Sequence, residues 1–258
     1  MLTDISLCSM TKKRFGLIGY PLGHSFSAGY FAEKFNRLQI EAEYLNFPIK
    51  NEEELKLFFR NVSKINGLNV TVPWKEKVMT YCQIWSPEAK LIGAVNCISL
   101  SSSGELVGHN TDWIGFTQSI SGLLQGKTVQ RALVLGTGGS SKAVQFSLQR
   151  LGIEVSFASE SKQEWSYSKL VGKMSQFQLV VQTTPLGMFP ETNACPSIPY
   201  SELHEGHICV DLIYNPEQTL FLKEAAKQGA TIKNGLDMLE YQAEESWKIW
   251  NSANEALI

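Results

Sequence analysis

Residues 132–152 read ALVLGTGGSSKAVQFSLQRLG, and this stretch decides the fold. An apolar run predicts a strand, the turn after it contains Gly136, Gly138 and Gly139, and the next segment predicts a helix. The first glycine permits a tight turn, and the next two allow main-chain N–H groups to approach a pyrophosphate at the positive end of the helix. The pattern predicts a dinucleotide site, although Ser141 replaces the third glycine of a GxGxxG motif and glycines also serve only to bend a chain.

Strand-like and helix-like segments alternate along the rest of the chain. Apolar, β-rich runs predict strands at 14–20, 42–47, 67–72, 94–100, 132–136, 154–159, 179–184 and 207–213. Asn51 and Glu54 predict the capped start of a helix over EEELKLFFRNV, and helical spacing predicts others at about 75–82, 112–124, 140–151, 163–174, 217–228 and 237–250. The alternation predicts an α/β protein whose parallel sheets are wound with crossover helices.

Composition limits the class of protein. The 258 residues are 43% apolar and 19% charged, so the chain can bury a core and is expected to form two domains. Lys and Arg number 23 against 25 Asp and Glu without a basic run, which argues against a nucleic-acid partner and favours small molecules. The apolar runs are shorter than the roughly 20 residues that cross a bilayer, and the N-terminal MLTDISLCSMTKK does not resemble a signal peptide. We therefore expect no membrane partner and a cytoplasmic location.

The cysteines and histidines do not form a metal-binding pattern. Five cysteines are scattered without CxxC spacing, which argues against a disulfide framework and a zinc site. The pair His204 and His207 has no third ligand nearby in the sequence and is interpreted as a solvated loop feature, with metal binding as the remote alternative. The expectation is that the protein holds no metal.

Polar residues follow the strand at 67–72. Residues 69–75 read NVTVPWK, so Asn69 and Thr71 share one face of the strand while the two valines point into the opposite, buried face. Proline cannot continue the ladder, so the strand is expected to end there and leave Lys75 beside the two polar side chains. Ligands bind at the carboxyl ends of strands in α/β sheets, which makes this trio a candidate polyol or carboxylate clamp. The alternative is an edge strand with a solvated lysine.

Two other short stretches carry the same kind of residues. In HSFS, Ser25 and Ser27 offer hydroxyl groups in a turn directly after the first strand. In GHNTDWIGF, Asp112 provides a carboxylate. Serines also cap helices, and a carboxylate at a helix start interacts favourably with the helix dipole, so structural roles remain open for both stretches.

The combination of motifs resembles the shikimate dehydrogenases, including the related quinate/shikimate enzymes. The resemblance runs in order from about Phe15 to Trp250 through IGYPLGHSFS, GLNVTVPWK, GAVNC, GHNTDWIGF, VLGTGGSSKAV, TTPLGM, VDLIYNP and NGLDMLEYQA. It implies an N-terminal α/β substrate-binding domain over 1–110, completed by a C-terminal helix within 236–258, and a Rossmann-type NADP-binding domain over 111–235. Members of the family reduce 3-dehydroshikimate to shikimate with NADPH, a step of aromatic amino-acid biosynthesis.

The resemblance also implies roles for single residues. Lys75 and Asp112 match the catalytic pair, in which a donor beside the carbonyl supplies the proton for the developing alkoxide and the carboxylate holds the lysine. The matched substrate-binding positions are Ser25, Ser27, Asn69, Thr71, Asn96, Tyr214 and Gln242. The matched cofactor positions are Gly136, Thr137, Gly138 and Gly139 in the diphosphate loop, and Gly235 and Met238 near the nicotinamide.

The chain departs from the family after the second Rossmann strand. Family members commonly carry Asn-Arg-Thr there, with the arginine on the 2′-phosphate of NADP, whereas residues 158–162 read ASESK. We expect NADP as the cofactor, with Ser159 and Lys162, assisted by Ser161, forming the phosphate site. NAD is the alternative, because a carboxylate such as Glu160 near this strand end favours the free 2′-hydroxyl.

The serine motif departs as well, and alternatives to the enzyme remain. Ala28 replaces the usual proline, and Phe31-Ala32 replaces a His-Asn pair, while the serine pair itself favours shikimate over quinate. The alternatives are an NAD-dependent quinate/shikimate paralogue and a non-catalytic ligand sensor, and a sensor would not require both Lys75 and Asp112. The protein is expected to be a monomer or a homodimer.

Overall fold

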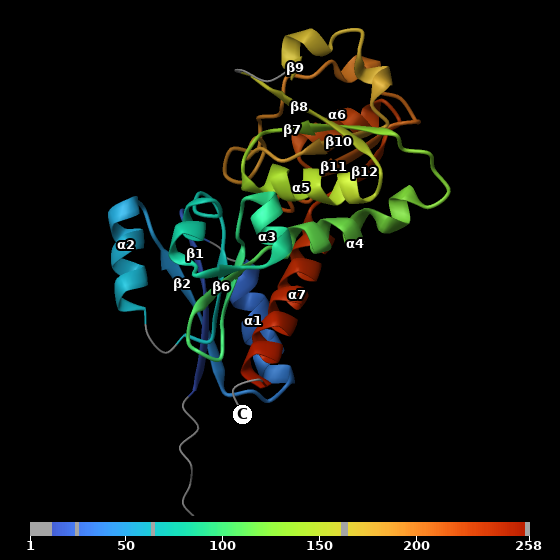
Figure 1. Cartoon of the computed structure of the whole chain (residues 1–258). Helices are drawn as coiled ribbons and strands as arrows, with labels where there is room; N and C mark the ends of the chain where they lie inside the picture. Colours follow the sequence, from blue (N-terminus) through green and yellow to red (C-terminus); the bar gives the residue numbers. More distant parts are fainter. Residues whose placement is uncertain (1–11, 24–25, 63–64, 161–164, 256–258) are drawn as a thin grey trace, which may run out of the picture.

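Two six-stranded sheets organise the chain, and the computed structural model describes residues 12–23, 26–62, 65–160 and 165–255. The first sheet has the order β2-β1-β3-β5-β6-β4 and the second the order β12-β11-β10-β7-β8-β9. Figure 1 shows the two sheets in separate units, with helix α7 running from the second unit back along the first. None of the helices in the described ranges is long and apolar enough to span a bilayer.

The first sheet is mixed rather than parallel throughout, contrary to the expectation. Its strands are β1 (Lys13–Gly19), β2 (Ala42–Pro48), β3 (Gly67–Val70), β4 (Ile84–Trp85), β5 (Cys97–Leu100) and β6 (Leu106–His109). β1 is parallel to β2 and β3, whereas β5 is antiparallel to both β3 and β6. The connection from β5 to β6 is a short turn at Gly104, which has a positive φ of 83°. Such a turn can join only antiparallel neighbours, because a parallel crossover needs a dozen or more residues.

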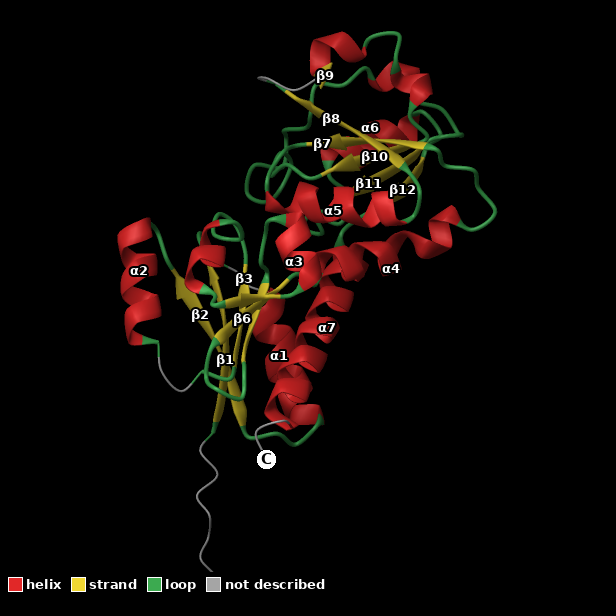
Figure 2. Cartoon of the chain, viewed as in Figure 1, coloured by secondary structure: helices red, strands yellow, loops and turns green. Residues whose placement is uncertain are grey.

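Helices cover both faces of the first sheet (Figure 2). α2 (Glu52–Asn61) lies on one face, and α1 (Phe26–Arg37) and α7 (Leu236–Glu255) lie on the other. Leu55 of α2 packs with Leu68 and Ile98, while Phe31 of α1 packs with Phe15. The predicted cap of α2 is confirmed, because Asn51 Oδ1 accepts a hydrogen bond from the Glu54 N–H at 2.9 Å.

The second sheet is parallel throughout, as expected. Its strands are β7 (Arg131–Leu135), β8 (Glu154–Ser159), β9 (Trp165–Ser166), β10 (Leu179–Gln182), β11 (Ile208–Asp211) and β12 (Thr231–Lys233). α4 (Asp112–Leu124) and α5 (Gly139–Arg150) pack on one face through Phe116 and Val144, and α6 (Leu220–Lys227) packs on the other through Phe221. The strand, glycine turn and helix predicted at 132–152 are confirmed.

Two expected helices are wrong. The described part of 163–174 forms the short strand β9 and a 3₁₀ turn at Tyr167–Leu170, and a second 3₁₀ turn begins at Met174, after Gly172 with its positive φ of 71°. Residues 75–82 contain only a 3₁₀ turn at Lys77–Tyr81. The sequence patterns did not predict the short helix α3 (Pro87–Ile92), the helix α1, or the strands β4, β6 and β12.

The C-terminal helix α7 joins the two units. It follows β12 of the second sheet and packs against α4, and its far end lies on the first sheet (Figure 1). Trp250 is fully buried there, stacks on Phe15 with ring centroids 4.9 Å apart, and donates a hydrogen bond from Nε1 to the Ile98 carbonyl at 3.0 Å. The expected return of the last helix to the first unit is confirmed.

We expect Gly67→Ala to destabilise the protein. A Cβ at Gly67 would overlap the indole ring of Trp250, which cannot move away because it is buried and hydrogen-bonded. The free energy of unfolding, measured by urea denaturation, should fall by about 1–3 kcal/mol. The control is Gly122→Ala on α4, where nothing lies within 4 Å of the new Cβ and where alanine should stabilise the helix by about 0.5–1 kcal/mol. Equal effects of the two substitutions would contradict the packing argument.

Candidate active site

The junction between the two units gathers a cluster of polar side chains. Asn69 lies in β3, Lys75 in the loop after it, Asn96 directly before β5, and Asp112 at the first residue of α4. Gln242 reaches the same place from α7. Apart from Lys75, each is at most 8% exposed. Buried polar groups require hydrogen-bond partners, so the contacts within this cluster define its geometry.

Lys75 forms the central contact of the cluster. Its Nζ lies 2.7 Å from Asp112 Oδ2 and 3.0 Å from Ser140 Oγ. The two charged side chains are 12% and 6% exposed, so little water screens the pair. The main chain of Lys75 is fixed as well, because its carbonyl accepts a hydrogen bond from the Val95 N–H at 2.7 Å. The structure thus brings the two predicted catalytic residues into direct contact.

Asn96 connects this ion pair to α7. Its Nδ2 donates to Asp112 Oδ1 at 2.8 Å, and the same group lies 2.9 Å from Thr111 Oγ1 and 3.3 Å from Gln242 Oε1. Its Oδ1 accepts the main-chain N–H of Thr111 at 2.6 Å. Both oxygens of Asp112 therefore have donors, which holds the carboxylate in one orientation.

Asn69 belongs to a second branch of the same network. Its Nδ2 donates to Ser246 Oγ at 2.9 Å, and its Oδ1 accepts from the Tyr44 hydroxyl at 2.9 Å. Ser27 in turn donates to the Tyr44 hydroxyl, whose pKa burial raises well above its ordinary value. Ser246 also lies 3.2 Å from Thr111 Oγ1, which closes the network between the two branches.

Two details of the NVTVPWK prediction are wrong. β3 ends at Val70, so the strict alternation of a strand does not extend to Val72, which is 63% exposed rather than buried. Thr71 is half-buried just beyond the strand, where its methyl group lies against Gly19 of β1. Thr71 remains beside Asn69, but they do not share a regular strand face.

Tyr214 approaches α1 from the loop after β11. Its hydroxyl accepts a hydrogen bond from the Phe26 N–H, and the two rings meet edge to face with centroids 5.8 Å apart. Burial raises the pKa of Tyr214. The loop is anchored by Asp211, whose Oδ1 accepts the Ile213 N–H at 2.9 Å and whose Oδ2 accepts the Thr219 hydroxyl at 2.5 Å. Tyr214 thus reaches the start of the helix that carries Ser27.

The glycine loop after β7 shows three different requirements. Gly136 has a φ of 110°, which only glycine adopts readily, and this confirms the tight turn. Gly138 has open space around it and heads α5 without a side-chain cap, and Thr137 beside it is exposed, so main-chain N–H groups are available to an anion. Gly139 has another role than expected. A Cβ added at this position would lie 3.1 Å from Lys75 Cβ, so the absence of a side chain permits the close approach of Lys75.

The remaining cofactor positions are spread over the second unit. Gly235 passes the Leu212 carbonyl so closely that no side chain fits there, and Met238, 8% exposed, packs into the core beneath α4. Ser159 is the last residue of β8 and pairs with Ser166, while Glu160 after it is exposed. The predicted residues Ser25, Ser161 and Lys162 lie outside the described residues.

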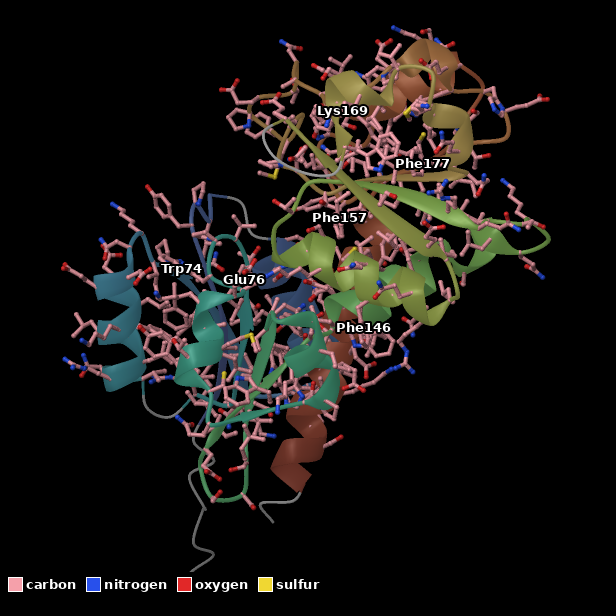
Figure 3. The ribbon with its side chains drawn as sticks, turned by 45° about the horizontal axis from the view of Figure 1, so that its top comes forward. Trp74, Glu76, Phe146, Phe157, Lys169 and Phe177 are labelled. Atoms are coloured by element: carbon pink, nitrogen blue, oxygen red, sulfur yellow. The ribbon has the colours of Figure 1, made fainter. Side chains whose placement is uncertain are left out.

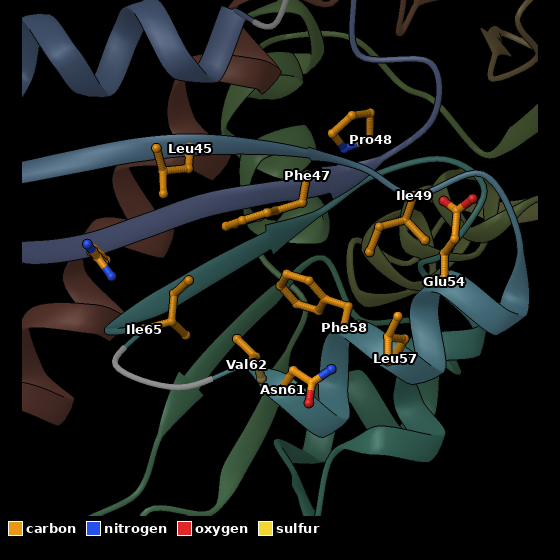
Figure 4. A pocket seen from close by; sticks show the side chains of 11 residues that line it. Leu45, Phe47, Pro48, Ile49, Glu54, Leu57, Phe58, Asn61, Val62 and Ile65 are labelled. Carbon is orange, nitrogen blue, oxygen red and sulfur yellow. The ribbon is translucent and has the colours of Figure 1, made fainter.

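Neither hollow described on the surface coincides with this cluster. A groove of about 490 Å³ lies between β2 and α2, with Phe47 and Leu57 among its lining side chains (Figure 4). A second one lies between the β5–β6 hairpin and α7, beside His109 and Lys248. Neither is lined by Asp112, Ser140 or Val95, the hydrogen-bond partners of Lys75, so both lie apart from the polar cluster at the junction.

No group of three or more potential metal ligands occurs within the part of the chain that the structure describes. The interpretation of His207 as solvated is wrong: the side chain is 2% exposed. Its Nδ1 accepts the His204 N–H at 3.1 Å, so Nε2 donates to the Met174 carbonyl at 3.2 Å, and burial lowers its pKa. Both ring nitrogens are thus used in structural hydrogen bonds.

Comparison with known proteins identifies the family. Residues 17–98 match the model of the shikimate dehydrogenase substrate binding domain. A shikimate dehydrogenase (NADP(+)) of Methanococcus vannielii is 37% identical over an alignment 257 positions long, and the match covers 91% of this chain and 90% of that protein. The chain belongs to the shikimate dehydrogenase family.

Solved structures of the shikimate dehydrogenase family share the fold. The enzyme from Aquifex aeolicus is 32% identical with a TM-score of 0.82, and the alignment covers 93% of each chain. The enzyme from Thermus thermophilus, solved with NADP(H) and shikimate, is 31% identical with a TM-score of 0.78, covering 93% of this chain and 94% of that one. The predicted fold class is confirmed.

Sequence reasoning missed four residues of the network. Thr111 and Ser246 are fully buried and link Asn96 and Asn69 to α7, and Tyr44 and Ser140 contact Asn69 and Lys75. Thr111 stands within GHNTDWIGF, directly before Asp112, and this stretch could have suggested it. Ser246 follows Gln242 by one helical turn, so helical spacing could have indicated it.

We expect Ser246→Ala to weaken the network. The substitution leaves Asn69 Nδ2 with only its 3.3 Å contact to the Asn96 carbonyl. The free energy of unfolding should fall by about 1–2 kcal/mol in urea denaturation, because a buried donor loses its better partner. Ser252→Ala is the matched control, since Ser252 makes the same hydroxyl contact to its own helix but is exposed. A loss no greater than that of the control would count against the network.

We expect the stability to depend on the protonation of Asp211. Burial raises its pKa from 3.8 to about 7, against the opposing hydrogen bonds from Thr219 and Ile213. Because the folded-state pKa lies above the unfolded one, the stabilisation is complete below about pH 4 and is lost as the pH rises through 7. Between pH 5 and 8 the wild type should lose roughly 2–4 kcal/mol relative to Asp211→Asn, measured by urea unfolding. If the free energies of unfolding of the two proteins changed with pH in the same way, the role of Asp211 protonation would be disproved.

Proposed function

We propose that the protein catalyses the reversible, NADPH-dependent reduction of 3-dehydroshikimate to shikimate. The observation that carries the proposal is the contact of Lys75 with Asp112 at 2.7 Å, placed directly beside the uncapped glycine loop of the second sheet. Relatives across most of the chain are named shikimate dehydrogenase (NADP(+)). A donor for the carbonyl oxygen thus lies next to a site suited to a dinucleotide.

The residues of the second unit fit a dinucleotide. Gly136 provides the turn, and the open N-terminus of α5 offers main-chain N–H groups and the positive helix end to a pyrophosphate. The bound cofactor supplies the hydride for the carbonyl carbon. The protein's own side chains position the ketone and donate the proton.

Lys75 and Asp112 perform the proton transfer. As hydride reaches the carbonyl carbon, negative charge develops on the oxygen, and the Lys75 ammonium stabilises this alkoxide and donates a proton to it. The hydroxyl group of shikimate results, and Lys75 then regains a proton from solvent. Asp112 holds the ammonium in place and balances its charge.

The substrate is held by hydroxyl and amide side chains from both units. Ser27, with Ser25, is suited to the carboxylate of the substrate, and Tyr214 approaches the same helix start. Asn69, Asn96 and Gln242 present amide groups that pair with ring hydroxyls, and Thr71 lies next to Asn69. Amides both donate and accept hydrogen bonds, so this set suits a polyhydroxylated acid.

The domain division follows from these roles. We assign residues 1–110, completed by 236–258, to substrate binding and residues 111–235 to the cofactor. In support, β1 to β6 form one sheet and β7 to β12 the other, and Trp250 of the last helix is buried against Phe15.

We assign NADP as the cofactor. Curated relatives are named for NADP(+), and Ser159, with Ser161 and Lys162, is proposed to hold the 2′-phosphate in place of the arginine of other family members. The NAD-dependent alternative depends on the exposed Glu160 next to Ser159. We also propose a cytoplasmic location and a monomer or homodimer.

A spectrophotometric assay tests the function directly. Reduction of NADP⁺ and NAD⁺ is followed by the absorbance of the reduced nicotinamide, with shikimate and with quinate as substrates. Turnover with shikimate and NADP⁺ is the expected result. Turnover only with NAD⁺ would make Glu160 the selecting residue, and no turnover in any combination would favour the ligand sensor.

We expect Lys75→Ala to lose roughly 10²- to 10⁴-fold in kcat, with little change in the KM for shikimate. The reason is that the ammonium acts on the developing alkoxide more than on the bound substrate. Lys77→Ala is the control, because Lys77 is two residues away but exposed and paired with Glu52. Near-normal turnover of Lys75→Ala would exclude this role.

A further inference from the structure

We propose that Ser140, in the first turn of α5, is a positioning residue for Lys75. It belongs to the unit that carries the glycine loop, whereas Lys75 belongs to the loop after β3 of the first sheet. Its Oγ accepts a hydrogen bond from Lys75 Nζ at 3.0 Å across the junction. The inference rests on the proposed function and adds to it a residue that sets the orientation of the ammonium.

The geometry of an ammonium group gives this contact its importance. A lysine ammonium has three N–H donors and rotates freely unless they are engaged. Asp112 Oδ2 takes one donor at 2.7 Å, and Ser140 Oγ takes a second. With two donors engaged, the direction of the third is fixed, and this third N–H is the one left for the substrate oxygen. Asp112 alone would leave the ammonium free to rotate about a single hydrogen bond.

The position of Ser140 is itself fixed by contacts between the units. Gly139 allows α5 to approach Lys75 and Ala94 closely, because a Cβ there would lie 3.1 and 3.5 Å from their Cβ atoms. Ala94 and Ala143 belong to one buried cluster, against which Phe146 packs. These side chains anchor the first turns of α5, so the Ser140 hydroxyl has a defined place.

An ion pair next to the site supports the same docking. Lys142 Nζ of α5 lies 2.7 Å from Glu76 Oε2, one residue after Lys75. Figure 3 shows Glu76 on the side of the first unit that faces α5, the helix that carries the labelled Phe146. The ammonium is therefore aligned by Ser140 only while the units are docked, which links the orientation of Lys75 to the loop proposed to bind the diphosphate.

Ser140 should act on turnover rather than on binding. We expect Ser140→Ala to lower kcat about tenfold, as for the loss of a hydrogen bond to a charged group, with the shikimate KM and the NADPH dissociation constant within twofold of the wild type. Ser140→Thr keeps a hydroxyl and should restore kcat to within threefold. Ser121→Ala is the matched control, because the Ser121 hydroxyl is exposed and donates to the Gln118 carbonyl of its own helix α4.

Three kinetic outcomes would overturn the proposal. They are a kcat of Ser140→Ala within twofold of the wild type, a loss of NADPH affinity as large as the loss of kcat, and a failure of Ser140→Thr to restore turnover. The second outcome would mean that Ser140 serves the diphosphate instead of the lysine. NADPH affinity is measured separately by fluorescence titration, so the two roles can be told apart.

A second measurement does not depend on catalysis. Acetylation by an N-hydroxysuccinimide ester is followed by mass spectrometry at Lys75 and, as an internal reference, at Lys12, whose side chain is 57% exposed. In Ser140→Ala, which lacks the contact, the rate of acetylation of Lys75 should rise at least threefold relative to the rate for Lys12. An unchanged ratio would overturn the contact itself, whereas a wild type inactive on shikimate would refute the proposed function and leave this readout valid.

Discussion

The buried ion pair between Lys75 and Asp112 is the constraint on which the rest of the site depends. Two charges removed from water are tolerated only when each is paired and their remaining hydrogen-bonding capacity is used. Asn96 meets this need at the second oxygen of Asp112, and Ser140 meets it at the ammonium. Because these partners come from both units, the ion pair can exist in this form only where the two units meet.

Helix α7 makes this junction possible. Gln242, Ser246 and Trp250 are spaced four residues apart and so lie along one side of the helix. The first two join the polar network, while Trp250 is buried in the aromatic core of the first unit. A single helix therefore contributes Gln242 and Ser246 to the polar network and also attaches the second unit to the first sheet.

The glycine loop has two functions in this chain. Its open N-terminal end at Gly138 suits a dinucleotide, and the neighbouring Gly139 lets α5 approach Lys75. The absence of a side chain at Gly139 is thus a packing requirement between the units. The loop that is proposed to bind the diphosphate also touches the residue that is proposed to supply the proton.

The sequence by itself determined the α/β alternation, the strand, glycine turn and helix at 132–152, and the family, because these depend on local periodicity and on motifs that are continuous along the chain. It also predicted some of the residues that meet at the junction, including Lys75 and Asp112, but not Thr111, Ser246 or Tyr44. Only the tertiary structure decided the antiparallel placement of β5, the exposure of Val72, the burial of His207 and the contact with Ser140. These features depend on which segments meet in space, and the pairing of distant segments leaves no periodic signal in either of them.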